Sequence, residues 1–144
     1  MINYYGKQRH FKLNLAGFFL FLIFVLNVNN NSAQKNFVSE ADVKFENEAY
    51  FSAIDLYKKG EVKEKNIKEK GRINFQIAEC YRLDVEPAQA ETYYKRAMKL
   101  KYHKDHPKLY ILLADVLVEE GEYDSAAEFI RKYLEIYPDD KHAN

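Results

Sequence analysis

The stretch that decides the fold is LADVLVEEGEYDSAAEFIRKYLEIYP, residues 113–138. It has small residues at two positions twelve apart, followed four residues later by a bulky one. The same spacing recurs in IAECYRLDVEPAQAETYYKRAMKL, residues 77–100, and in ADVKFENEAYFSAIDLYKKG, residues 41–60. The matching positions are Ala41, Ala78 and Ala114; Ala53, Ala90 and Ala126; and Tyr57, Tyr94 and Ile130. Intervals of 37 and 36 residues indicate a repeated supersecondary unit.

Each unit has the pattern of two antiparallel helices. Ile73, Ile77 and Tyr81 recur every four residues and form one apolar helix face. Gly121 suits the turn between two helices, and Pro87 suits a first helical turn. We therefore predict an all-α solenoid of about three helix pairs over residues 34–138. The expected repeats are 34–70, 71–106 and 107–138, with a short C-terminal tail at 139–144.

Residues 1–33 have the plan of a secretory signal. A basic start is followed by the apolar run LNLAGFFLFLIFVL, residues 13–26, and by small residues ending at Ala33. The run is shorter than the roughly 20 apolar residues that a membrane-spanning helix needs. We predict cleavage after Ala33 and export to the bacterial periplasm or cell envelope. An uncleaved signal that anchors the chain in the membrane is the alternative.

Composition narrows the classes of function. The 144 residues contain 22 Lys+Arg and 22 Asp+Glu, so the balance argues against a nucleic-acid binder. Cleavage after Ala33 would remove three basic residues and no acidic one, leaving 19 basic against 22 acidic residues. The chain is 47% apolar and has one cysteine, so it has material for a core but none for an internal disulfide.

The second and third segments resemble the tetratricopeptide repeat family. The third segment matches the family pattern at Tyr110, Leu113, Ala114, Leu117, Gly121, Tyr123, Ala126, Ile130 and Pro138. The second matches at Ile77, Ala78, Tyr81, Ala90, Tyr94 and Ala97; the first matches at Ala41, Tyr50, Ala53 and Tyr57. The resemblance implies a scaffold or adaptor for protein partners, without catalysis or a cofactor. The chain also looks similar to the N-terminal repeat module of exported envelope proteins that carry a propeller and an OmpA-like domain. Some of those proteins serve secretion machineries.

The same resemblance places a partner-binding groove along the first helix of each pair. The repeat register assigns to this groove Val38, Asp42, Phe45, Arg72, Phe75, Glu79, Arg82, Lys108, Ile111, Asp115 and Val118. Such a mixed surface suits an extended peptide or a helix. Phe75 and Ile111 are alternatively part of the core between repeats.

The histidine-rich run HKDH and the single cysteine are the remaining candidates for chemistry. The run HKDH places His103, Asp105 and His106 close in sequence, which would allow a metal-dependent enzyme, although a solvated loop is favoured. Cys80 lies between Ala78 and Tyr81, where a small packed side chain is expected.

The last helix is expected to lack a polar cap. It would expose part of the face that carries Ile130, Tyr133, Leu134 and Tyr137, which favours self-association or partner docking.

Overall fold

The computed structural model describes residues 37–139, which are all-helical with no strand. Helical residues 37–46 are followed by α2 (Tyr50–Lys63), α3 (Ile67–Leu83) and α4 (Pro87–Lys99). A short 3-10 helix, η1 (Tyr102–Lys104), then leads to α5 (Leu109–Glu119) and α6 (Tyr123–Ile136). The predicted all-α class is confirmed. The predicted signal, residues 1–33, and residues 140–144 of the predicted tail lie outside the described residues.

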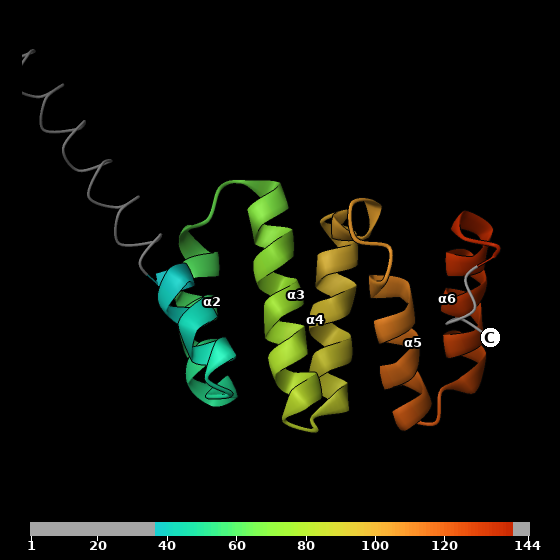
Figure 1. Cartoon of the computed structure of the whole chain (residues 1–144), viewed down its shortest axis with the longest axis horizontal. Coiled ribbons are helices and arrows are strands. Elements are labelled where there is room, and N and C mark those ends of the chain that lie inside the picture. The colour runs from blue at the N-terminus through green and yellow to red at the C-terminus, as the bar shows by residue number, and fades with distance from the viewer. Residues whose placement is uncertain (1–36, 140–144) are drawn as a thin grey trace, which may run out of the picture. The chain divides into compact units, whose positions relative to one another are not determined.

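The helices follow one another along the stack. In Figure 1, α2 to α6 stand side by side in sequence order, and each of α2 to α5 packs on the helix that follows it. Connections from a second helix to the next pair lie at the upper edge of this view, and turns within a pair lie at the lower edge. This is the arrangement of a helical-pair solenoid, in which each repeat contacts only its neighbours.

One turn geometry joins the two helices in all three repeats. Glu48, Val85 and Gly121 each adopt a positive φ, at 59°, 60° and 79°. The residue after each donates its backbone N–H to a carbonyl five positions back, at 2.8–2.9 Å. These bonds satisfy carbonyls at the helix end, as in a Schellman-type cap. The turn residues are 37 and 36 positions apart, so the backbone repeats with the same period as the sequence.

The repeated small residues lie in the core between the helices. The six alanines of the two repeated positions are all buried, between 0% and 2% exposed. The bulky residues of the third repeated position are Tyr57 and Tyr94, which are fully buried, and Ile130, which is partly buried and packs on the core. Burial of this kind is the main source of stability in such a stack.

Gly60 of α2 lies close against the helical segment 37–46. A Cβ placed on Gly60 would lie 2.6 Å from Val38 Cγ2, so an alanine does not fit without movement. The glycine therefore makes room for Val38. Tight packing of this kind leaves little tolerance for one more methyl group.

Two helix starts follow from their local sequence. Asn66 caps α3, because its side-chain oxygen accepts from the backbone N–H groups of Lys68 and Glu69. Pro87 occupies the first turn of α4, as predicted. Within residues 37–139, no helix combines the length and apolar character needed to cross a bilayer.

Candidate functional site

The predicted groove residues lie on three helices. Helical residues 37–46 supply the first group, α3 the second, and α5 with the residue before it the third. We call their common side the first-helix surface. Its three parts differ in whether their charged side chains already form hydrogen bonds and ion pairs within the chain.

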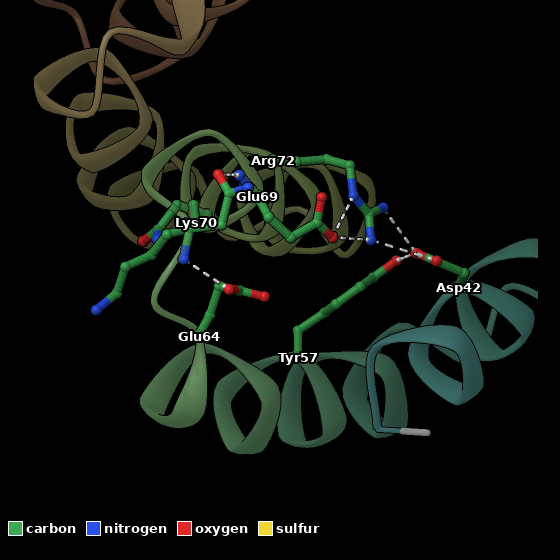
Figure 2. A network of polar contacts seen from close by, with 8 residues as sticks. Asp42, Tyr57, Glu64, Glu69, Lys70 and Arg72 are labelled. Carbon is green, nitrogen blue, oxygen red and sulfur yellow. Dashed lines mark hydrogen bonds and ion pairs between the residues drawn. The ribbon is translucent and has the colours of Figure 1, made fainter. Parts of the chain in front are cut away.

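In the first repeat, Asp42 is the centre of a polar network. Figure 2 shows the Tyr57 hydroxyl pointing at this carboxylate, to which it donates at 2.5 Å. Arg72 of α3 donates to the same carboxylate, with Nη1 3.0 Å from Oδ1, and pairs with Glu69 at 2.8 Å. The network thus joins both helices of the first repeat to the first helix of the second. Burial lowers the Arg72 pKa, but its bonds to Glu69 and Asp42 outweigh that effect and raise the pKa overall.

The second repeat contains the same tyrosine–acid pair. The Tyr94 hydroxyl of α4 donates to Glu79 of α3, and Arg82 pairs with this carboxylate at 2.8 Å. Tyr94 and Glu79 stand 37 positions after Tyr57 and Asp42. Burial is the first cause of the raised pKa of both tyrosines, and the adjacent carboxylates add to it. Both hydroxyls therefore remain protonated donors at neutral pH.

The third repeat lacks this internal pairing. Ile130 stands where the tyrosine would be, so nothing in α6 replaces the hydroxyl donor. Asp115, the matching acid, is exposed, and its carboxylate has no hydrogen bond or ion pair among residues 37–139. Lys108 is also exposed, Val118 is 45% exposed, and Ile111 is half-buried. This is the part of the first-helix surface whose charged groups are open.

The predicted aromatic and aliphatic groove residues lie mostly against the core. Val38 is only 8% exposed and packs on the backbone at Gly60, so assigning it to an open groove was wrong. Phe45 packs beside Tyr50, with ring centroids 5.7 Å apart. Phe75 contacts the rings of Tyr94 and Tyr102 at 5.9 and 5.3 Å, and so contributes to packing between helices.

The HKDH side chains have separate surroundings. Asp105 pairs with Lys68 at 3.1 Å, whereas the ring of His106 stacks on Tyr102. His103 meets the edge of Tyr110, and its Nδ1 is buried without a hydrogen-bond partner. Over residues 37–139, no three His, Cys, Asp or Glu side chains are placed to hold one metal ion. The structure therefore gives the metal-enzyme alternative no assembled site.

Cys80 is fully buried in the core. Burial, with a further effect of the Glu79 charge, raises the pKa of its thiol to about 12. A thiol of this kind is largely protonated at neutral pH and is a poor nucleophile.

Sequence reasoning missed the two tyrosine–acid pairs and two further polar side chains, Asn74 and Lys58, that join neighbouring helices. The amide of buried Asn74 donates to Glu61 of α2 at 2.7 Å and to the Lys70 carbonyl at 2.9 Å. Lys58 of α2 donates to the Tyr81 hydroxyl at 2.9 Å and lies near the rings of Tyr81 and Tyr93. The signal available for the tyrosine–acid pairs was a separation of 15 residues that occurs twice in register.

The face of α6 that was expected to be exposed in part contains both buried and exposed side chains. Tyr133 is buried, while Ile130 and Leu134 are half-buried. Tyr137 is exposed and lies beside Tyr133, and Ile136 is also exposed. Self-association through this face stays a prediction.

Comparison with known proteins agrees with the helical-pair geometry. A model of the tetratricopeptide repeat family matches residues 85–144, which include α4, α5 and α6. The match supports a tetratricopeptide repeat family for this part of the chain. No curated protein matches the chain.

Proposed function

We propose that this tetratricopeptide repeat chain is an adaptor that holds a protein partner on the first-helix surface of its third repeat. Repeats of this family are in general protein–protein interaction modules. The observation that carries the proposal is the contrast at matching positions. Asp42 and Glu79 are bound within the chain, whereas Asp115 is open to a partner.

The open part of the surface has both charged and apolar groups. Lys108, Asp115 and Val118 offer a cation, an anion and an aliphatic side chain along one helix. An amphipathic helix or an extended peptide makes contacts of each kind. A partner that carries a basic and an apolar side chain fits best, because Asp115 then receives the donor that Tyr57 or Tyr94 supplies in the other repeats.

We further propose that the adaptor acts in the bacterial cell envelope, within a secretion or envelope-assembly complex. The support is the basic and apolar pattern of residues 1–33 and the small residue at Ala33. The alternative is a membrane-anchored repeat subunit that retains this segment. N-terminal sequencing of the protein from the envelope fraction distinguishes the two: cleavage gives Gln34 first, and an anchored form retains residues 1–33.

A photocrosslinking experiment tests the adaptor proposal. Val118 is replaced by a photoreactive benzoylphenylalanine in cells that express the full chain, and adducts are identified by mass spectrometry. The matched control carries the same residue at Val62 of α2, which is 84% exposed but lies away from the first-helix surface.

We expect one protein to be crosslinked reproducibly from position 118 and not from position 62. Equal adducts from both positions, or none from position 118, would contradict docking at the third repeat.

A further inference from the structure

We propose that a cavity at the upper edge of the stack is a second docking site, for an acidic segment of a partner protein that inserts an apolar side chain. The proposal rests on the adaptor function above but uses a different surface. The cavity, called here the edge cavity, lies between the start of α3 and the connection that follows α4. Both segments lie at the upper edge in Figure 1.

The edge cavity has the size and floor of a side-chain pocket. Its volume is about 580 Å³. Stacked rings of Tyr102 and His106, with centroids 4.1 Å apart, and the side chains of Leu100 and Ile67 contribute its apolar surface. A flat anionic surface would leave such a hollow unfilled, whereas a protruding aromatic or aliphatic side chain would fill it.

Gly71 allows the two walls to come together. A Cβ on Gly71 would lie 3.1 Å from Tyr102 Cβ and 3.6 Å from Leu100 Cβ. Without that atom, the connection after α4 lies directly against α3, and Tyr102 reaches the ring of Phe75. The cavity is thus held by packed elements.

Lysines at the cavity carry uncompensated positive charge. Its two carboxylates are already engaged, Asp105 by Lys68 at 3.1 Å and Glu69 by Arg72 at 2.8 Å. Lys101 and Lys104 are exposed and have no acidic partner among residues 37–139. These two ammonium groups are available to carboxylates of a ligand, as charge complementarity requires.

The helix end does not supply this charge. Two of the N–H groups in the first turn of α3, those of Lys68 and Glu69, already donate to Asn66 Oδ1. The lysine side chains are therefore the groups that would recognise an anion.

The opposite edge of the stack has the reverse character. The turns within the pairs carry exposed acids: Glu48, Asp84, Glu86, Glu119, Glu120 and Glu122. An acidic segment is repelled from this lower edge and attracted to the upper one, which favours one orientation of the partner. The acidic residues of the lower edge and the lysines of the upper edge therefore both favour binding of an acidic segment at the edge cavity.

Fluorescence anisotropy with three labelled peptides tests the proposal. The peptides are GDEFEDG, its form without the aromatic residue, GDEGEDG, and the charge-reversed GKRFKRG. The protein is the full 144-residue chain in a non-ionic detergent, titrated at low and at physiological salt. The charge variant is K101E/K104E, and the matched control is K59E/R131E, which makes the same charge change at exposed positions on α2 and α6.

We expect GDEFEDG to bind the native chain more tightly than either other peptide, and more weakly as salt increases. Binding should fall roughly ten-fold or more in K101E/K104E, and little in K59E/R131E, with unchanged circular-dichroism melts for both.

Equal loss in both variants would overturn the proposal, since it would show a general charge effect. Equal affinity for GDEFEDG and GDEGEDG would overturn it by excluding side-chain insertion. Lysine-dependent binding to phosphatidylglycerol vesicles without binding of GDEFEDG would assign the edge to a lipid surface instead. Crosslinking from position 118 is independent of the edge cavity, so it separates failure of this proposal from failure of the adaptor function.

Discussion

At the scale of single residues, the turn within each helix pair has a residue with positive φ, and this residue is a different amino acid in each repeat. Val85 has a φ of 60° and is 79% exposed, so it accepts the strain of a β-branched residue in the left-handed region and gains little burial. Gly121 adopts the same geometry without that strain. Gly121 indicated its turn in the sequence, because glycine is typical of a positive φ. Val85 and Glu48 gave no such signal, because packing of the two helices that each of them joins imposes their conformation.

We predict that Val85→Gly stabilises the chain by about 0.5–1 kcal/mol, because relief of left-handed strain exceeds the added flexibility of the unfolded chain. The matched change Gly121→Ala should destabilise it by about 1 kcal/mol. Urea unfolding followed by circular dichroism measures both. A destabilised V85G would mean that the turn of the second repeat depends on the valine side chain.

Cys80 gives a second prediction at this scale. Because the thiol is buried and largely protonated, a disulfide reagent such as dithionitrobenzoate should label it at pH 8 only when the chain unfolds. Labelling is followed by absorbance in native buffer and in concentrated urea. Fast labelling in native buffer would show that the core around α3 opens readily.

Cys80 ionisation also has a definite effect on stability. The pKa of the thiol is about 12 in the folded chain, whereas in the unfolded chain the pKa has its ordinary value of 9.0. Below pH 9 the two states bind this proton equally. As pH rises from 9 to 12, the unfolded state releases it first, and the free energy of unfolding falls. We expect Cys80→Ala to weaken this alkaline loss, as measured by urea midpoints between pH 8 and pH 11.

At the scale of elements, the contact between α2 and helical residues 37–46 depends on Gly60. We predict that Gly60→Ala destabilises the chain by about 1–3 kcal/mol, because its Cβ would overlap Val38 Cγ2. In a Val38→Ala background the same change should have a smaller effect, since the conflicting methyl group is absent. Equilibrium unfolding of the four chains gives the coupling energy, and additive effects would contradict the contact.

The pair between Asp42 and Arg72 connects two repeats. We predict that Arg72→Met lowers the free energy of unfolding by about 0.5–1 kcal/mol, because a half-buried carboxylate loses its cationic partner. Lys59→Met is the control, since Lys59 is exposed and has no ion pair within residues 37–139. The difference between the two variants should shrink at high salt. An equal effect of both changes would mean that the pair contributes nothing.

At the scale of the whole molecule, periodicity predicted the architecture because it reports contacts that recur in every repeat. Buried alanines at intervals of 37 and 36 residues are such contacts, and the all-α class that they indicated is confirmed. The openness of the groove was not predictable in the same way. Whether Asp42, Glu79 or Asp115 is free depends on a hydroxyl fifteen residues later, and Ile130 removes it in one repeat only. The burial of Val38 depends on an interhelix distance that no spacing reports.

The repeat periodicity of the sequence could not predict the edge cavity either. Its walls come from the connection after α4, which differs in length from the connection after α2 and contains η1. Irregular connections of this kind carry specific function on regular scaffolds because they break the repeat. The repeat period accounts for the stack, and departures from it are where we propose that partners bind.

The most direct test of the central claim compares charge reversal at two matching acids, Asp42→Lys and Asp115→Lys. Each variant is measured by thermal melting and by crosslinking yield from position 118. Asp42→Lys should lower the melting temperature, because it places a cation beside Arg72 and removes the acceptor of Tyr57. Asp115→Lys should leave melting nearly unchanged and abolish the crosslink, because its carboxylate is open. If Asp115→Lys melted like Asp42→Lys, or crosslinked like the native chain, the division between stack-forming and partner-binding repeats would be wrong.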